Sequence, residues 1–447
     1  MINELKTLYD LFYYKIWYNT CNYFNIDKQN LYENIYNYIS KKGPVFIKIG
    51  QILSSKTFID PLLRNKLKRL KNRSDNTDEK TYFEKLKISN IVTIFPIPFA
   101  CGSITKLYKC IYIKNGKNVL SVLKVCIVDI DKKIKRDIKL IKKLLTFGSY
   151  FFKDILMLKN GIIWDSYFQE LIDQCDLRNE VFNIRKFQRL TTLHNLNHLI
   201  QLPTIHRFNK DYILESYEQG ENIETFVKKH KSKTFETISL LTNVFQISLT
   251  QQWNFFHSDM HTSNYMFSLN EKKNVILTLI DFGLVSKLNK EFSKNLENSF
   301  DKIKFKINID SLLNCIFSEM RRYNSNEKVE KFIDKLIETR NYNNIEIPHM
   351  YFEENSKFRN CFNILNYTQD VLNIIDTAFY YNIKIDSIIV NLFQNLLLLD
   401  EIRVKYIKGN PIELMDNKLI AKIGNQDPFF KFWEFNKRYS IIKFNNR

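Results

Sequence analysis

Apolar residues recur at helical spacing through the first 90 residues of the chain. They lie among lysines and asparagines, and no run alternates between apolar and polar residues as a half-buried strand would. The clearest set is Leu8, Leu11, Phe12 and Ile16. A polar break from Ser74 to Lys80 interrupts the pattern near its end. We therefore predict that residues 1–90 form a helical segment.

The pattern changes near Ile91, where short runs become rich in β-branched and aromatic residues. Three such runs cover residues 91–100, 106–114 and 118–128. Asn115-Gly116 separates the last two runs, and an Asn-Gly pair in that position is typical of a tight β-hairpin. This part of the chain therefore predicts a small sheet.

Helical periodicity returns after these strands. Residues 131–146 form a basic segment whose apolar residues share one face, namely Ile134, Ile138, Ile141 and Leu145. A second helical stretch covers about 164–190, and residues 206–223 indicate two short strands with a glycine-containing crossover. Beyond residue 221 the pattern is helical to the end, except for two strands over 265–280.

This order predicts a two-lobed α+β enzyme with a cleft between its lobes. We expect a helical extension over residues 1–90, an N-lobe over 91–217 that contains the sheet, and a mostly helical C-lobe over 218–447.

Composition narrows the class of protein. Hydrophobic residues make up 45% of the chain and the mean hydropathy is −0.30, which argues against a disordered chain and against a polytopic membrane protein. The apolar run from Ile388 to Leu399 is interrupted by Asn391, Gln394 and Asn395, so we expect a buried helix there. The N-terminus does not resemble a signal peptide. We expect an intracellular protein, cytoplasmic or peripheral on a membrane.

Charge and cysteine content point to possible partners. The chain has 67 Lys+Arg against 48 Asp+Glu, a net charge of +19 that would favour an anionic lipid surface. Because no recognised nucleic-acid motif accompanies the charge, a nucleic-acid partner is not expected. The seven cysteines form no C-x-x-C pair, so we expect neither a disulfide framework nor a cysteine-rich zinc site.

The sharpest chemical signal lies between residues 257 and 283. His257, Asp259 and Asn264 have the spacing H-x-D-x-x-x-x-N, and after the predicted hairpin comes Asp281-Phe282-Gly283. Phosphoryl transfer needs a carboxylate near the attacking hydroxyl or water, which Asp259 would supply. Mg²⁺ prefers oxygen ligands, which Asn264 and Asp281 would supply. The pattern predicts a kinase-like enzyme with ATP and Mg²⁺ as cofactors.

The histidines allow another interpretation. His257 and His261 are four residues apart and could bind zinc as a pair, but no third ligand is evident and Asp259 has a better role in phosphoryl transfer.

Nucleotide-binding residues are predicted upstream of the catalytic loop. Lys124 lies on the strand after the Asn-Gly turn and would bind phosphates, paired with Glu180 on a helix. Glu215, followed by Gly220, fits the hinge between lobes where the backbone contacts adenine. The stretch that would cover the phosphates contains Ala100, Cys101, Gly102 and Ser103. The chain has no G-x-G-x-x-G before Lys124, no Walker A motif and no A-P-E after Asp281.

Several of these segments resemble the UbiB atypical kinases, the aarF-domain-containing group. Residues 43–56 contain Lys48-Ile-Gly50-Gln51, which resembles the K-x-G-Q signature of that family. Residues 100–103 are similar to its Ala-rich loop, 174–183 to its E-x-D motif with the helical Glu, and 257–264 to its catalytic loop. The resemblance runs from about residue 40 to 415 and includes the family's C-terminal helix.

The resemblance implies a kinase fold whose N-terminal extension covers the cleft. Lys48 and Gln51 would then lie near the phosphates, with Lys48 in a catalytic role, where a protein substrate would otherwise bind. It also implies Mg-ATP binding and a link to isoprenoid-quinone or other lipid metabolism at membranes. ATP hydrolysis or small-molecule phosphorylation is then favoured over protein phosphorylation.

The chain departs from the family pattern at several positions. Gln174 replaces the first acid of E-x-D, so Lys48 loses an expected partner, for which Asp173 or Asp176 could substitute. Lys106 stands where Gln is usual, and Thr262-Ser263 replace Pro-Gly. Because the catalytic acid and the metal ligands are retained, an active enzyme is favoured. The alternatives are a phosphotransferase like aminoglycoside or choline kinases, and a nucleotide-binding pseudokinase scaffold.

Overall fold

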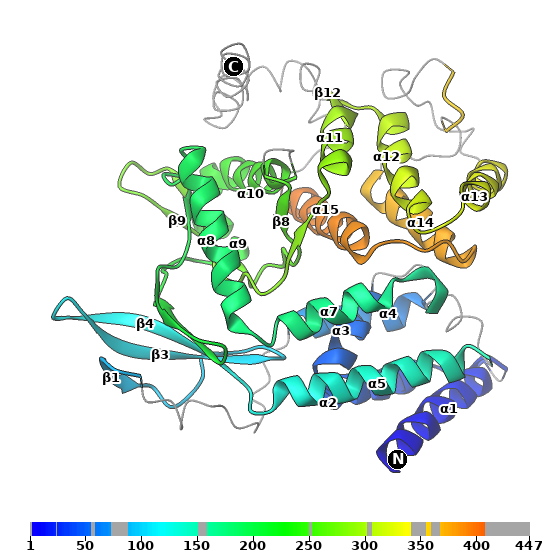
Figure 1. Ribbon diagram of the computed structural model, residues 1–447, viewed down its shortest axis with the longest axis horizontal. Helices are drawn as coiled ribbons and strands as arrows, with labels where there is room; N and C mark the ends of the chain where they lie inside the picture. Colours follow the sequence, from blue (N-terminus) through cyan, green and yellow to red (C-terminus); the bar gives the residue numbers. More distant parts are fainter. Residues whose placement is uncertain are drawn as a thin grey trace.

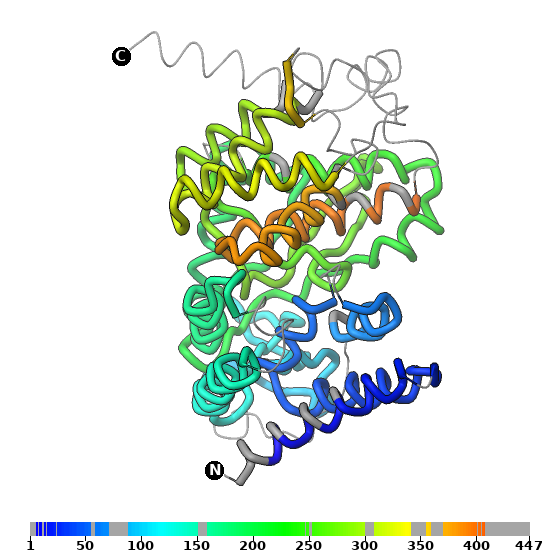
Figure 2. The backbone as a smooth tube through the Cα atoms, turned by 90° about the vertical axis from the view of Figure 1, so that its right-hand side faces the viewer, coloured from blue at the N-terminus to red at the C-terminus, as the bar shows by residue number. Residues whose placement is uncertain are grey.

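The computed structural model describes residues 2–23, 25–54, 59–72, 88–150, 159–249, 253–301, 306–340, 355–358 and 367–406. The polar break at Ser74 to Lys80 and the chain after Tyr406 lie outside these residues. Figures 1 and 2 both place the N-terminal helices at one end of the molecule, beside α5 and α7, and the later helices α11 to α15 at the opposite end. The main sheet projects to one side (Figure 1). The fold is the α+β, kinase-like fold that the sequence predicts.

The main sheet is antiparallel and has the order β1-β3-β4-β7-β6, with β2 paired to β3. Its strands are β1 (Ile91–Ile94), β2 (Ala100–Cys101), β3 (Thr105–Lys114), β4 (Lys117–Cys126), β6 (Ile205–Phe208) and β7 (Tyr212–Ser216). The hairpin between β3 and β4 turns at Asn115 and Gly116, whose φ angles are 51° and 74°. Two consecutive left-handed residues suit an Asn-Gly pair, and the predicted hairpin is confirmed.

Three helices accompany this sheet: α5 (Ile130–Gly148), α7 (Trp164–Asp173) and α8 (Leu177–Leu193). The sequence predicts one helical stretch over 164–190, but two helices form. Asp176 adopts an extended conformation, and its side chain accepts a hydrogen bond from the backbone N–H of Arg178. This N-cap begins α8 and separates it from α7, because a capping residue lies outside helical geometry.

The C-terminal half contains more strands than the sequence predicts. The expected pair over 265–280 forms β9 (Tyr265–Leu269) and β10 (Val275–Leu279), and β5 (Ile200–Gln201) adds to β10 in parallel. β8 (Phe255–His257) pairs with β11 (Val285–Lys287), and β12 (Phe300–Asp301) pairs with β13 (Lys306–Ile307). The prediction of helix everywhere else beyond residue 221 is therefore wrong. Strands of two or three residues are too short to show a period.

The remaining C-terminal elements are helices. They are α9 (Ile223–Lys229), a 3₁₀ turn (Lys231–Lys233), α10 (Thr234–Ser248), α11 (Lys290–Ser299), α12 (Ile309–Arg321), α13 (Asn326–Thr339), α14 (Tyr367–Tyr380) and α15 (Ser387–Tyr406). α15 contains the interrupted apolar run of the sequence, and its Leu392, Phe393 and Leu399 are buried in the main core. Within the described ranges, no helix combines the length and apolarity needed to cross a bilayer.

The N-terminal extension consists of α1 (Ile2–Tyr23), α2 (Gln29–Lys42), α3 (Pro44–Leu53), α4 (Pro61–Lys68) and a 3₁₀ turn (Arg69–Asn72). Val45, Phe46 and Ile52 of α3 are buried in the main core, so this helix is part of the same packed body as the lobes. A Cβ atom on Gly50 would lie 2.5 Å from Leu70 Cδ1, closer than packing allows. The glycine of Lys48-x-Gly50-Gln51 therefore permits the contact that fixes α3.

Candidate active site

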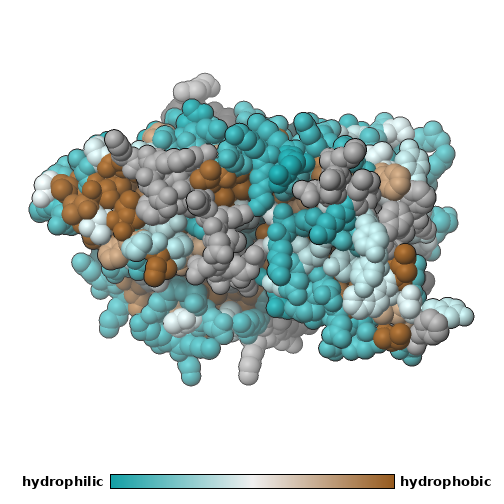
Figure 3. Space-filling model, turned by 90° about the horizontal axis from the view of Figure 1, so that it is seen from below, coloured by the Kyte–Doolittle hydropathy of each residue, from teal (hydrophilic) through white to brown (hydrophobic). Residues whose placement is uncertain are grey.

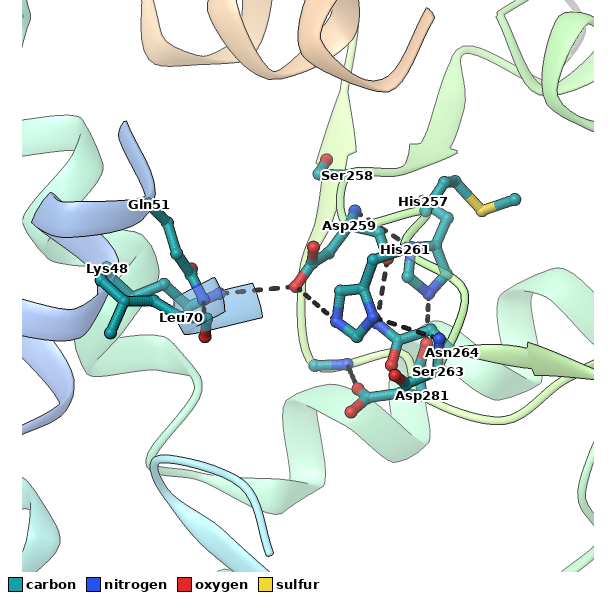
Figure 4. Close-up of polar contacts among 12 residues, drawn as sticks. Lys48, Gln51, Leu70, His257, Ser258, Asp259, His261, Ser263, Asn264 and Asp281 are labelled. Atoms are coloured by element: carbon teal, nitrogen blue, oxygen red, sulfur yellow. Dashed lines mark hydrogen bonds and ion pairs between the residues drawn. The ribbon is translucent and has the colours of Figure 1, made fainter. Parts of the chain in front are cut away.

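Two strand ends bring the catalytic acids together. β8 ends at His257, and the following loop carries Asp259 and Asn264 to the start of β9; β10 ends just before Asp281. The backbone N–H of Ile280 donates to the carbonyl of Asn264 at 3.1 Å, which ties the two segments to each other. Figure 4 shows Asp259 and Asp281 on neighbouring loops, with Lys48 approaching from α3.

His257 connects these two loops. Its Nδ1 accepts the backbone N–H of Asp259 at 3.1 Å, and its Nε2 lies against the carbonyl oxygen of Asp281. Burial lowers the pKa of His257, so the ring is neutral at physiological pH. Both ring nitrogens are occupied by backbone groups, so His257 has none left for zinc. The zinc-pair interpretation with His261 therefore does not fit this geometry.

Lys48 lies in the cleft and contacts Asp259. Its Nζ is 3.4 Å from Asp259 Oδ2, and the two side chains are 15% and 30% exposed. Burial raises the pKa of Asp259, but the positive charge of Lys48, together with His261 at 3.6 Å and His257, lowers it by more in sum, so the pKa stays below its ordinary value. Asp259 is therefore a carboxylate at neutral pH, held by a lysine from the N-terminal extension.

The prediction that Asp173 or Asp176 pairs with Lys48 is wrong, because Lys48 contacts Asp259 instead. Asp176 is occupied as the N-cap of α8 and pairs with Arg178, whose Nη2 is 2.6 Å from its Oδ2. Asp173 is likewise engaged, since it accepts from Gln169 at 2.8 Å. Both acids serve the break between α7 and α8.

Lys124 forms a buried ion pair with Glu180. Lys124 Nζ is 2.7 Å from Glu180 Oε1 and 3.5 Å from Asp281 Oδ2, and the side chains of Lys124 and Glu180 are only 6% and 4% exposed. Burial alone would lower the pKa of Lys124, but the two carboxylates raise it, so the ammonium stays charged. Glu180 also accepts the backbone N–H of Phe282 at 3.2 Å, which couples α8 to the Asp281-Phe282-Gly283 segment.

This ion pair carries a stability prediction. Glu180→Gln leaves a buried lysine with one charged partner fewer. The free energy of unfolding, measured in urea, should therefore fall by about 3 kcal/mol, the lower end of the range for a broken buried ion pair. The matched control is Glu327→Gln on α13, which removes an exposed pair with Lys331 at 2.5 Å. That control should change stability by about 0.5 kcal/mol or less. Equal effects of the two variants would contradict the buried pairing.

Asp281 and Asn264 have the chemistry of magnesium ligands. The side chain of Asp281 is 43% exposed, far more than those of Lys124 and Glu180, so its carboxylate is open to the cleft. Burial raises its pKa, but Lys124 and the backbone N–H of Gly283, which donates to Oδ1 at 2.8 Å, hold the pKa well below the ordinary value. The amide of Asn264 is buried nearby, and its Nδ2 donates to the carbonyl of Asp259 at 2.9 Å. An ionised carboxylate and an amide oxygen suit Mg²⁺.

Glu215 lies deeper than the hinge position suggests. It is 4% exposed on β7, where its backbone is in register with Val122 on one side and Ile205 on the other. Burial raises its pKa well above the ordinary value, and the nearby Glu180 adds to this effect. Glu215 is therefore a buried acid near Lys124, and its surroundings favour the protonated form. β7 ends at Ser216, and the hinge role of Glu215 and of the residues that follow β7 stays a prediction.

The predicted phosphate loop is a strand followed by a turn. Ala100 and Cys101 form β2, opposite Leu107 and Lys106, and the N–H of Gly102 donates to Thr105 at 2.8 Å. Among the described glycines, only Gly43 and Gly116 have positive φ, so Gly102 does not use the left-handed conformation that glycine permits. A Cβ there would meet Thr105 O at 3.4 Å, an ordinary contact. Ser103 lies in the turn, and the segment is a short hairpin ahead of Lys124.

Gln51 is placed in the same cavity as Lys48 and Asp259. Its Nε2 donates to the carbonyl of Leu70 at 3.1 Å, which ties α3 to the 3₁₀ turn after α4 (Figure 4).

Sequence reasoning missed two residues that contact or face the catalytic loop. Asn395 of α15 accepts the N–H of Met260 at 2.7 Å and donates to the carbonyl of Ser258 at 2.8 Å, so it holds the loop on both sides of Asp259. Its signal was visible as a polar residue inside an apolar run. Glu170 of α7 lines the cavity beside Asp259. It precedes Gln174 by one helical turn, so it shares that residue's face.

Comparison with known proteins agrees with this geometry. The family model described as ABC1 atypical kinase-like domain matches residues 77–312. The chain is 25% identical over 429 residues to a protein of Clostridium pasteurianum named only as an uncharacterized protein in the hydrogenase 1 5′ region, covering 90% of this chain and 73% of that one. It is 27% identical to the probable protein kinase UbiB of Aliivibrio salmonicida, over 58% of this chain and 49% of that protein.

The chain thus spans about half the length of the curated UbiB kinases that it matches. Among solved structures, the Rv3197–erythromycin complex from Mycobacterium tuberculosis matches with 14% identity and a TM-score of 0.35, covering 71% of this chain and 78% of that one. The family model matches more than half of the chain. The chain belongs to the ABC1 atypical kinase-like family, as the resemblance to the UbiB kinases led us to expect.

Proposed function

We propose that this chain is an atypical kinase or ATPase that transfers the terminal phosphoryl group of Mg-ATP to a small acceptor or to water. The observation that carries the proposal is Lys124, buried and fully charged between Glu180 at 2.7 Å and Asp281 at 3.5 Å. A protein maintains such an arrangement at a cost in desolvation, and a lysine held by a helical glutamate beside a metal-binding aspartate is the phosphate-binding unit of kinases.

The other residues take roles around this unit. Lys124 binds phosphate oxygens, and Asn264 with Asp281 would hold Mg²⁺, which neutralises charge on the phosphates when bound. Asp259 orients the nucleophile and accepts its proton. Adenine would lie against the backbone beyond β7, and the β2 hairpin at Ala100 to Ser103 would cover the phosphates.

The cavity beside Asp259 is small. Lys48 and Gln51 of α3 form one wall of a cavity of about 60 Å³ beside Asp259. Since a water molecule occupies about 10–15 Å³ on this measure, the space suits a few waters or a small group. This supports ATP hydrolysis or small-molecule phosphorylation over protein phosphorylation. A context in lipid or isoprenoid-quinone metabolism is part of the proposal because the resemblance to the UbiB kinases implies it. A phosphotransferase of the aminoglycoside or choline kinase type remains the second candidate, and the Lys48 to Gln51 segment argues against it.

The acceptor can be identified from the products. Phosphorus NMR of Mg-ATP incubated with the purified protein should show ADP and inorganic phosphate when water is the acceptor. Addition of choline, an aminoglycoside or an isoprenoid alcohol in vesicles should divert the phosphate into a new ester if one of them is accepted. A phosphorylated generic protein substrate, such as myelin basic protein, with no free phosphate would contradict the proposal.

The β2 hairpin carries its own prediction. Replacing Ala100 and Cys101 with glycine raises the entropic cost of ordering the hairpin backbone by about 0.5–1 kcal/mol at each position. Because the hairpin must be ordered to cover the phosphates, the affinities for ATP and ADP should weaken about fivefold or more. Lys117→Gly with Asn118→Gly is the matched control, because both are exposed at the other end of the same sheet. Affinities like wild type in a folded Ala100→Gly/Cys101→Gly variant would exclude the hairpin as a phosphate cover.

We propose that an anionic membrane surface contacts helix α5. Its outward side carries Lys132, Lys135, Arg136, Lys139 and Lys143, all exposed. Phe147 and Tyr150 follow at its C-terminal end, 44% and 78% exposed. On the face seen from below, hydrophilic residues occupy much of the coloured surface, and the largest apolar areas lie at the sheet end (Figure 3). Basic residues with adjacent aromatic side chains suit a negatively charged bilayer.

Changing Lys135, Arg136 and Lys139 to glutamine should weaken binding to phosphatidylserine-containing vesicles roughly 100-fold, since each basic residue near the surface contributes about 1 kcal/mol. The charge-matched control replaces Lys228, Lys331 and Lys335, which lie on α9 and α13 away from α5 (Figure 1). Vesicle flotation measures both variants. Equal losses would mean that net charge, and not α5, determines the binding.

A further inference from the structure

The cavity beside Asp259 contains a second carboxylate. α3, α7, α15 and the catalytic loop enclose it, and its lining includes Lys48, Asp259, Glu170 and Gln174. Lys48 contacts Asp259 across this space. Glu170 and Gln174 are four residues apart on α7, so both project from one face of that helix toward the same cavity.

Glu170 is only partly satisfied by its neighbours. Ser387, the first residue of α15, donates to Oε1 at 3.2 Å. The other oxygen, Oε2, is buried without a hydrogen bond of ordinary geometry among the residues that the structure describes, and the side-chain amide of Asn391 is close enough to lower the pKa of this carboxyl group. Leaving a carboxylate oxygen buried without a partner is costly. The Glu170 side chain lines the cavity in which Lys48 lies.

The electrostatic surroundings of Glu170 include Lys48. The pKa of Glu170 is raised to about 7, chiefly by burial and also by the charge of Asp386, while hydrogen bonds with Ser387 and Asn391 and the charge of Lys48 lower it in part. Burial raises the pKa of Tyr167 on the same helix, and the charges of Glu170 and Asp259 raise it further, so both carboxylates lie near this side chain. Lys48 therefore already interacts with Glu170 through space while it contacts Asp259.

We propose that Glu170 is the alternate partner of Lys48, and that Lys48 moves from Asp259 to Glu170 when Asp259 engages the acceptor. This rests on the proposed function of Asp259. As long as the ammonium of Lys48 contacts Asp259, that carboxylate is a weaker proton acceptor and the space the nucleophile needs is occupied. Glu170 is thus a positioning residue, which acts on the reaction only through Lys48.

The movement needs a second carboxylate in reach. Lys48 is 15% exposed, so a lysine that left Asp259 without a new partner would be a largely buried, unpaired charge. Gln174 is neutral and cannot supply the charge. Glu170, one turn earlier on the same face, can, and the flexible four-carbon chain of lysine suits a short shift within a cavity of about 60 Å³.

The first test is ATP turnover by Glu170→Gln, which keeps the shape of the side chain and removes its charge. We expect kcat to fall at least tenfold with Mg-ATP affinity unchanged. In wild type, kcat should fall as the pH drops below 7 and Glu170 takes up a proton, and this limb should be absent in Glu170→Gln. Adding Gln174→Glu to Glu170→Gln should restore much of the rate, because the charge returns to the same face of α7.

Two further variants separate this role from a structural one. Asp173→Asn removes a carboxylate from the same helix that contacts Gln169 instead, and should leave kcat unchanged. In a Lys48→Met background, Glu170→Gln should have no further effect. Normal kcat in Glu170→Gln, or an equal effect with and without Lys48, would overturn the inference.

A crystal structure of Asp259→Asn tests the inference without turnover. With the charge of Asp259 removed, Lys48 should be within hydrogen-bond distance of Glu170. A lysine that stays against residue 259 or turns to solvent would overturn the inference, whereas a wild-type protein that fails to hydrolyse ATP would count against the proposed function alone.

Discussion

Asp281→Asn is expected to abolish magnesium-dependent nucleotide binding. Asp281 is ionised, open to the cleft and 3.5 Å from the lysine that would meet the phosphates, so it is the carboxylate placed to bridge metal and phosphate. A ligand at 100 times its dissociation constant stabilises the folded protein by about 2.7 kcal/mol. The rise in melting temperature that wild type shows with Mg-ATP should therefore vanish in Asp281→Asn.

The control for this measurement is Asp165→Asn. Asp165 is 85% exposed on α7 and pairs with Lys142 at 2.6 Å, away from the cleft. Its variant should melt and bind Mg-ATP like wild type. An undiminished Mg-ATP shift in Asp281→Asn would remove Asp281 from the metal site.

Asp259→Asn should separate binding from chemistry. An amide cannot accept the proton of the nucleophile, and loss of a general base lowers rates by about 10²–10⁴-fold. Lys124, Glu180 and Asp281 are untouched, so Mg-ATP binding should stay within about twofold of wild type. ADP formation measures the first quantity and calorimetric titration the second.

The result also bears on Lys48. If Asp259 served only to hold Lys48 in place, Lys48→Met would lower turnover as much as Asp259→Asn. We expect the lysine variant to retain measurable activity, because Asp259 would then be free to face the acceptor.

The sequence predicted those elements of the fold that are determined by residues close together in the chain. The hairpin at Asn115-Gly116 and the helix over 131–146 form as expected, because turn chemistry and apolar period act within a few residues. The break between α7 and α8 was missed, although Asp176 is a recognisable N-cap. β8 and β11, three residues each, owe their existence to pairing with each other across 28 residues of chain and show no period of their own.

The site was predicted in its composition but not in its pairings. The spacing of residues from His257 to Asp281 predicted which residues form the catalytic loop and the metal site. The contact between Lys124 and Glu180 was predicted from their positions on a strand and on a helix. The partner of Lys48 did not follow, because Lys48 and Asp259 are 211 residues apart and meet only through the packing of α3. Gln174 is a neutral residue where the family has an acid, and Glu170 lies one helical turn before it on the same face. That spacing was the signal in the sequence that could have identified Glu170 as a second carboxylate near Lys48.

We propose above all that the chain turns over Mg-ATP and that Asp259 orients the nucleophile and accepts its proton. The most direct test is the steady-state rate of ADP formation by the purified protein, with and without Mg²⁺, compared with Asp259→Asn. We predict a saturable, magnesium-dependent rate in wild type that falls at least 100-fold in Asp259→Asn while both proteins bind Mg-ATP. Binding without any turnover in wild type would contradict the account and identify the chain as a nucleotide-binding pseudokinase.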